Sequence, residues 1–129
     1  MKRIIFLVLL IIFIKNSNAQ QFKFAFLSDT HISTDPGVPA DDLRRTITDI
    51  NLQKDLEFVV ITGDITEMGT DSEIKLAKSI FAQLKIPFYI IPGNHDTGWS
   101  ESGGLSFIRE FGYDKFVFDH KGYRFIGCA

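Results

Sequence analysis

The chain has 129 residues, about the length of one domain, and its 45% hydrophobic and 23% charged content is that of a globular protein. The formal net charge is −2, or −5 without the first nineteen residues, and this acidic balance argues against sequence-independent binding to nucleic-acid polymers or to anionic membranes. The one cysteine, Cys128, excludes a disulfide bond within the chain.

The first nineteen residues have the pattern of a secretory signal peptide. Lys2 and Arg3 precede an unbroken apolar run over 4–14, and the small residues Ser17 and Ala19 stand where a cleavage site requires them. Eleven apolar residues are too few for a membrane-spanning helix, which needs about 20. We therefore predict cleavage near Ala19 and export, to the periplasm or the medium, with no stable membrane span. Loss of three basic side chains with this segment leaves 11 basic and 16 acidic ones, a formal charge of −5.

The rest of the chain alternates strands and helices. Apolar runs predict strands over 22–28, 56–62 and 87–91. The spacing of apolar residues predicts a helix over 40–54, and a capping box of Thr70 and Glu73 opens a second helix. A short helix and a hairpin follow, over 105–111, 116–119 and 123–126. This order predicts an α/β domain with a parallel sheet built by right-handed crossovers.

Each of the three predicted strands runs into a cluster of polar residues. The clusters are Asp29-Thr30-His31, Gly63-Asp64 and Gly93-Asn94-His95-Asp96. Asp29 and Asp64 are 35 residues apart, and Asp64 and Asn94 are 30 apart, so one β-α unit separates each pair. Because parallel strands end at the same edge of a sheet, the clusters are expected to meet there, where open α/β sheets bind ligands.

Carboxylate, imidazole and amide groups form a ligand set that suits Zn²⁺, Mn²⁺ or iron. Asp29 and His31 are close enough in sequence to reach one ion, and Asp64 can place an oxygen on each of two ions. Asn94 would be a neutral ligand to the second ion. His95 is placed to protonate a leaving group, with Asp96 orienting its imidazole.

Each cluster alone also fits a structural role. Asp29 and Asp64 could cap the segments that follow them, and Gly93-Asn94 suits a plain turn. His120 fits a half-exposed residue beside the hairpin turn, and Trp99 fits either a pocket wall or a cover for the edge of the core. The joint occurrence of the three clusters, in order and at strand ends, favours the functional interpretation.

At these three clusters, with Gly69 downstream of the second, the sequence over 22–98 resembles the calcineurin-like metallophosphoesterases. The resemblance implies a four-layer αββα sandwich with a centre of two divalent or transition-metal ions (Mn, Fe or Zn). The matching positions imply metal ligation by four residues: Asp29, His31, Asp64 and Asn94. They also imply a place for His95 near the leaving group. The implied reaction is hydrolysis of a phosphoester by a metal-activated water.

The family pattern continues with later histidines that complete both metal sites. This sequence has only His31, His95 and His120, and His120 follows Asp119 where the family pattern has glycine. We therefore expect residues 20–129 to be the N-terminal half of the catalytic domain, to carry part of the dinuclear site and to be inactive alone.

Two further functions stay open at this point. The first is a non-catalytic exported binding protein, or a decayed fragment, on the same scaffold. The second is a phosphotransferase in which Asp29 attacks phosphorus, which would leave Asn94, His95 and Asp96 without a role. The residues do not choose between a monoester, diester, nucleotide or pyrophosphate substrate, and they leave the oligomeric state open.

Overall fold

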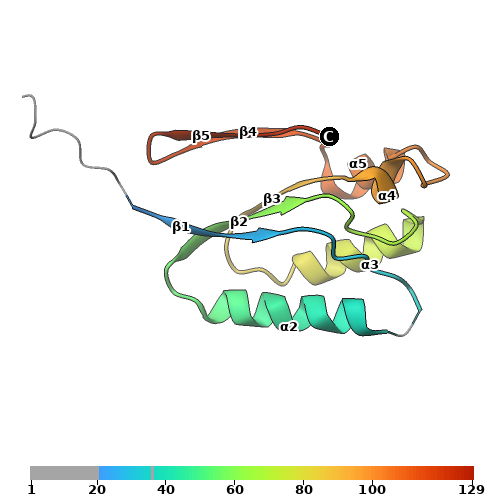
Figure 1. Cartoon of the computed structure of the whole chain (residues 1–129), viewed down its shortest axis with the longest axis horizontal. Coiled ribbons are helices and arrows are strands. Elements are labelled where there is room, and N and C mark those ends of the chain that lie inside the picture. The colour runs from blue at the N-terminus through green and yellow to red at the C-terminus, as the bar shows by residue number, and fades with distance from the viewer. Residues whose placement is uncertain (1–20, 36) are drawn as a thin grey trace, which may run out of the picture.

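A computed structural model describes residues 21–35 and 37–129, so the predicted signal peptide and its cleavage site lie outside the described residues. The described chain forms three layers (Figure 1). Two helices lie below a three-stranded sheet, and a two-stranded hairpin lies above it. Within these residues, no helix combines the length and apolar character needed to cross a membrane.

The sheet is parallel, as the sequence predicts. It consists of β1 (Lys23–Leu27), β2 (Leu56–Thr62) and β3 (Phe88–Ile91), in the order β1-β2-β3. β2 is central and is the most buried strand, because it pairs on both sides and is covered on both faces. The α/β class expected from the sequence is therefore confirmed.

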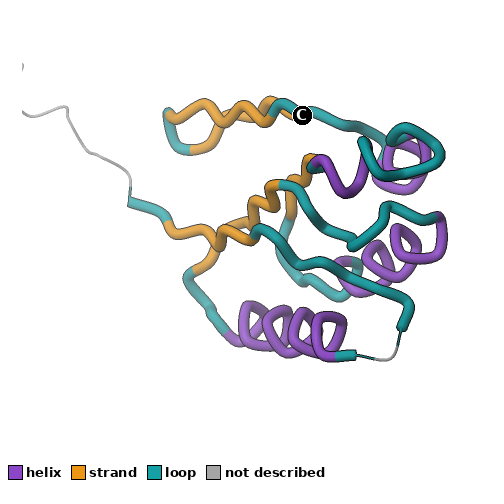
Figure 2. Tube along the Cα trace, turned by 45° about the vertical axis from the view of Figure 1, so that its right-hand side comes forward, coloured by secondary structure: helices purple, strands orange, loops and turns teal. Residues whose placement is uncertain are grey.

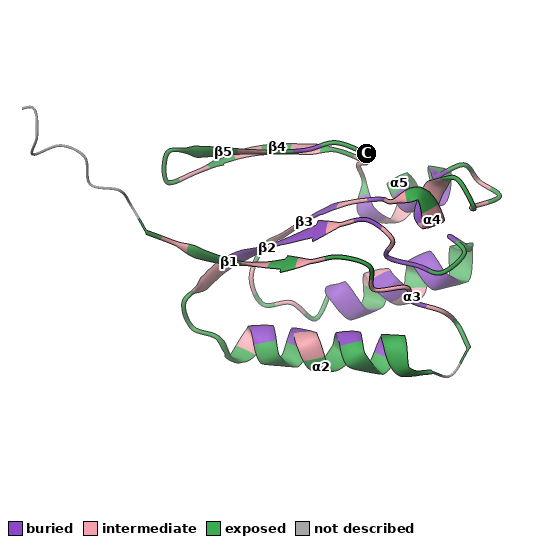
Figure 3. Ribbon diagram, in the orientation of Figure 1, coloured by how far each residue is buried: buried purple, intermediate pink, exposed green. Residues whose placement is uncertain are grey.

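Two helices cover one face of the sheet. They are α2 (Val38–Leu52) and α3 (Asp71–Phe81), and in Figure 3 the buried stripe of α2 faces the strands. α2 begins two residues before the predicted position because its proline lies in the first turn, where a missing N–H costs nothing. α3 begins at the predicted capping box, in which both the Thr70 and the Glu73 side chains bind backbone N–H groups.

The hairpin covers the opposite face, as Figure 2 shows from a second direction. It consists of β4 (Phe116–His120) and β5 (Tyr123–Gly127). Phe118 stacks on Tyr89 of β3 with ring centroids 3.6 Å apart, and Phe125 meets Phe58 of β2 edge-on at 5.1 Å. An aromatic layer therefore joins the hairpin to the sheet. The outward face of the hairpin carries Val117 and Ile126, which are 65% and 67% exposed.

Glu57 of β2 anchors the turn of the hairpin to the sheet. Its carboxylate lies 2.8 Å from Nε2 of His120 and also accepts a hydrogen bond from Lys121 Nζ. These bonds, that of Lys121 first, lower the pKa of Glu57 below its usual range. His120 therefore has a larger structural role than a half-exposed residue beside a turn, since its ring also packs against Phe22 and Phe58.

We expect the contribution of this anchor to decrease as the pH falls. A carboxyl group whose pKa is lower in the folded than in the unfolded state stabilises the folded state at pH values above its unfolded pKa, which is about 4.3 for glutamate. This stabilisation is lost as the pH falls through the folded pKa. Urea midpoints of the parent chain and Glu57→Gln, measured from neutral to acidic pH, should therefore differ most near neutrality and converge in acid. A difference that does not change with pH would contradict this assignment.

Candidate metal centre

The loops after β1 and β2 run side by side beyond the sheet. Asp29 N donates to Gly63 O at 3.2 Å, and His31 N donates to Asp64 O at 3.1 Å. These bonds continue the parallel pairing past the ends of the strands. As a result, one ligand atom from each of Asp29, His31 and Asp64 lies within 4.8 Å of the others. Three of the four predicted metal ligands therefore meet at the predicted edge.

The backbone is unusual at these same three residues. φ is 55° at Asp29, 43° at His31 and 46° at Asp64, and only one other non-glycine residue in the described part of the chain, Lys121, has positive φ. A residue that has a Cβ adopts the left-handed conformation at a cost of roughly 1–3 kcal/mol. Residues held in this conformation are concentrated at functional sites. Three polar residues with this conformation lie together at the ends of neighbouring strands, which favours a functional site.

The loop after the third strand supplies the residue that fits against Asp64. Gly93 has an extended backbone, but a methyl group added to its Cα would overlap the carboxylate and the backbone nitrogen of Asp64. His95 N also donates to Asp64 Oδ1 at 3.1 Å. The glycine therefore lets two loops approach closely, and the next turn of chain fixes the orientation of the Asp64 carboxylate.

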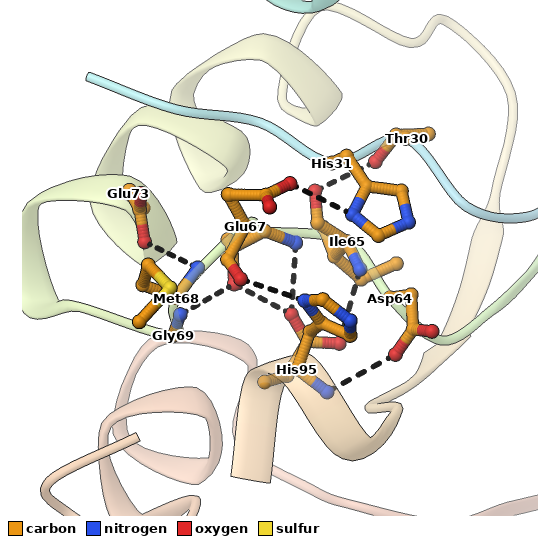
Figure 4. A network of polar contacts seen from close by, with 11 residues as sticks. Thr30, His31, Asp64, Ile65, Glu67, Met68, Gly69, Glu73 and His95 are labelled. Atoms are coloured by element: carbon orange, nitrogen blue, oxygen red, sulfur yellow. Dashed lines mark hydrogen bonds and ion pairs between the residues drawn. The ribbon is translucent and has the colours of Figure 1, made fainter. Parts of the chain in front are cut away.

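A second cluster lies beside the first and shares His31 with it. One ligand atom from each of His31, Glu67 and His95 lies within 4.8 Å of the others. Figure 4 shows Glu67 beside both imidazoles, with His31 Nδ1 3.0 Å from Glu67 Oε2. A carboxylate only accepts, so a neutral His31 carries its proton on Nδ1 and leaves Nε2 for a ligand. Glu67 was not predicted from the sequence.

His95 is oriented by a backbone carbonyl. Its Nδ1 lies 2.7 Å from the carbonyl oxygen of Glu67, which can only accept a hydrogen bond. In the neutral ring the proton is therefore on Nδ1, and Nε2 is left for a substrate or an ion. The ring lies edge-on to His31, with centroids 4.8 Å apart.

Asp96 has different partners from those expected. Its side chain is 1% exposed, and within the described residues its carboxylate accepts hydrogen bonds from Ile65 N, Thr66 N, Thr66 Oγ1 and Gly93 N, at 2.7–3.1 Å. Consecutive residues of a helix point about 100° apart, so Asp96 points inward where His95 points to the site. The predicted orienting contact with the His95 imidazole is replaced by the Glu67 carbonyl, and Asp96 ties the loops after β2 and β3 together.

Asn94 opens the one-turn helix α4 (Asn94–Thr97) directly after Gly93. The residue is exposed, and its backbone carbonyl oxygen accepts hydrogen bonds from Gly98 N at 2.7 Å and Trp99 N at 3.2 Å. The backbone of Asn94 therefore closes the turn, and these bonds do not use its side-chain amide. Its role as a metal ligand stays a prediction.

The donor set fits a divalent metal ion. Asp29 and Asp64 bring two carboxylates close together, and such a pair is stabilised by a cation between them. Oxygen and imidazole donors without a thiolate suit Zn²⁺, Mn²⁺ or iron. Asp29, His31 and Asp64 are therefore the residues here that could hold an ion, and Glu67 and His95 lie directly beside them.

Comparison with known proteins agrees with this geometry. The family model of the calcineurin-like phosphoesterases matches residues 22–127, which is most of the chain. The chain belongs to the calcineurin-like phosphoesterase family. This membership confirms the resemblance found in the sequence, and the parallel sheet with its helices is consistent with a metallophosphatase-like fold. The family also implies divalent metal ions, in agreement with the two clusters.

Several members of this family with curated names are similar in sequence. A "Probable glycerophosphodiester phosphodiesterase" of Arcobacter nitrofigilis is 39% identical over 77 residues, covering 54% of this chain and 28% of that protein. "Probable cyclic nucleotide phosphodiesterases" of Fibrobacter succinogenes and Rhodopseudomonas palustris are 33% and 34% identical, each over 57% of this chain and 30% and 29% of their own lengths. The chain therefore spans under a third of the length of these phosphoesterase relatives.

Proposed function

We propose that the protein hydrolyses phosphoesters, with phosphodiesters as the substrate class, and that this chain supplies the N-terminal ligands of the metal centre. The observation that carries the proposal is the convergence of Asp29, His31 and Asp64 at the carboxyl edge of the sheet, beside His95. The names of the similar proteins, which include diesterases for glycerophosphodiesters and cyclic nucleotides, support the substrate class.

Each of the residues at the candidate metal centre has its own role in this proposal. Asp29, His31 and Asp64 would hold one cation, and the amide of Asn94 would be a ligand to a second. Bound divalent cations supply Lewis acidity toward the phosphoryl oxygens and lower the pKa of water. The carboxylate of Glu67 holds His31 in the tautomer that leaves Nε2 for an ion. After cleavage near Ala19 the protein is exported, and it acts on phosphoesters outside the cytoplasm.

His95 handles the leaving group in this scheme. The Glu67 carbonyl holds a proton on Nδ1, so the proton that moves is the one on Nε2. When the imidazole is protonated, Nε2 donates to the departing alkoxide oxygen and the alcohol leaves neutral. The carboxylate of Asp96 acts at a distance, because it fixes the loop that carries both Gly93 and His95.

Metal binding by the 129-residue chain tests the proposal. We expect Mn²⁺ to bind weakly, at one ion per chain in titration calorimetry, and affinity to fall at least about tenfold in Asp64→Asn, which removes a charged ligand. Asp49→Asn is a matched control, since it removes the same charge from the exposed face of α2.

Turnover by the same preparations completes the test. The chain carries only part of the two-metal ligand set, so we expect little or no hydrolysis of bis-p-nitrophenyl phosphate or p-nitrophenyl phosphate with added Mn²⁺. Robust activity with two bound metals would contradict the partial site, and unaltered Mn²⁺ binding in Asp64→Asn would contradict the metal centre. Metal binding without any turnover, in a longer protein that contains this chain, would favour the exported binding protein instead.

A further inference from the structure

A half-exposed tryptophan lies directly against the candidate metal centre. The ring of Trp99 is 3.8 Å from that of His95, centroid to centroid, with the planes inclined at 38°. The side chain is 54% exposed, although it is the largest apolar group in the chain and the sequence contains only one tryptophan. A residue that served only to cover the edge of the core would bury more of this surface. Core packing therefore does not explain why an indole stands here.

The same indole lines a cavity of about 590 Å³, which is within the size range of small-molecule sites. The walls come from the loop over 68–70, Asp71 at the start of α3, the loop over 99–102, and Ser106 and Arg109 of α5 (Leu105–Phe111). The first of these loops directly follows Glu67 of the metal centre. Trp99 thus belongs to both regions, since it contacts His95 and also forms a wall of the cavity.

The walls of the cavity are held together by their own contacts. Arg109 donates to Asp71 Oδ2 at 2.9 Å, and Ser106 Oγ also donates to the Asp71 carboxylate. Ser102 Oγ accepts from Ser106 N at 3.1 Å, which ties the loop of Trp99 to α5. The cavity is therefore formed before any ligand enters, so ordering of the walls does not oppose binding.

We propose that Trp99 and this cavity bind the organic group of the substrate and favour a planar aromatic group, such as a nucleobase, over glycerol. The inference rests on the proposed phosphoesterase function, because a phosphoryl group held at the metal ligands would extend its alcohol part past His95 and onto Trp99. The indole, which is 54% exposed, presents a π-face on which a base can stack, and the charged side chains of Glu101 and Arg109 in the cavity wall offer polar contacts to a sugar. Glycerol offers no ring to the indole.

The single tryptophan makes this subsite directly observable. Indole fluorescence, excited where tyrosine does not absorb, reports on Trp99 alone. We would titrate the Mn²⁺-loaded chain with adenosine monophosphate, glycerol 3-phosphate and inorganic phosphate, and the metal-free chain with adenosine. Adenosine monophosphate should quench the indole and bind about tenfold more tightly than glycerol 3-phosphate, the effect expected of one stacked base. Adenosine should quench the indole without metal.

Substitutions then separate stacking from phosphate binding. In calorimetry, Trp99→Ala should lose the preference for adenosine monophosphate and bind inorganic phosphate as the parent chain does. Trp99→Phe should keep much of the preference, because a smaller ring still stacks. Equal affinities for the two phosphomonoesters in the parent chain, or a preference that survives Trp99→Ala, would overturn the proposal. Absence of Mn²⁺ binding would overturn the proposed function instead, whereas the adenosine titration of the metal-free chain tests the subsite independently.

Discussion

Substitution of Asp96 by asparagine is expected to destabilise the fold by about 2–4 kcal/mol, the largest effect we predict for a polar residue here. The carboxylate is buried and accepts four hydrogen bonds, from three backbone N–H groups and one hydroxyl. Asparagine keeps the shape of the side chain but turns an NH₂ group toward N–H donors. At least one buried donor then loses its partner, and a buried unsatisfied group costs about 1–3 kcal/mol.

Urea denaturation of Asp96→Asn measures this effect, with Asp49→Asn as the matched control. Asp49 lies on the exposed face of α2, so its substitution should change the free energy of unfolding by less than about 0.5 kcal/mol. If Asp96 acted mainly by orienting His95, stability would change little, so a parent-like urea midpoint would contradict the structural role. Backbone amide exchange at Ile65, Thr66 and Gly93 should accelerate in the variant, because these groups lose their acceptor.

Gly93→Ala is the second change with a large expected effect, and it acts on binding more than on stability. The added methyl group would occupy the space of the Asp64 carboxylate and backbone nitrogen, so Asp64 must move. A shift of a ligand away from its partners should lower Mn²⁺ affinity by about 10–100-fold, as the loss of supporting contacts does at metal sites. The cost in folding free energy should be about 1–3 kcal/mol, as for other overpacked positions.

Titration calorimetry with Mn²⁺ tests Gly93→Ala, with Gly37→Ala as the control. Gly37 is also extended, and a methyl group there would meet only ordinary contacts of 3.6–3.8 Å. The control should therefore retain the affinity of the parent chain. An affinity for Mn²⁺ that is unchanged in Gly93→Ala would show that Asp64 does not bind the ion, and it would count against the proposed centre.

The sequence predicts the framework of the site because its information is local and repeated. Apolar runs fixed the three strands to within a residue or two, and the capping box of Thr70 and Glu73 marked the start of α3. Parallel topology follows from the alternation of strands and helices, and it brings the residues at the strand ends to one edge. The convergence of Asp29, His31 and Asp64 could therefore be predicted without knowing any distance.

The parts that sequence reasoning missed depend on how loops bend. Glu67 follows Asp64 by three residues with no motif around it, and it contacts His31 after a left-handed turn of the chain at Asp64. The partners of Asp96 depend on α4, a helix of one turn that apolar periodicity cannot reveal. Contacts between neighbouring loops thus decide the roles of Glu67 and Asp96, whereas strand order decides those of Asp29 and Asp64.

The left-handed conformations of Asp29, His31 and Asp64 have a consequence for how this region tolerates change. Glycine adopts such a conformation without strain, so a chain optimised for stability alone would carry glycine at all three positions. The protein instead keeps large polar side chains there and accepts a less stable fold. Substitution by glycine should therefore stabilise the fold at the same residues that we assign to the metal centre, so a gain in stability there should come with a loss of metal binding.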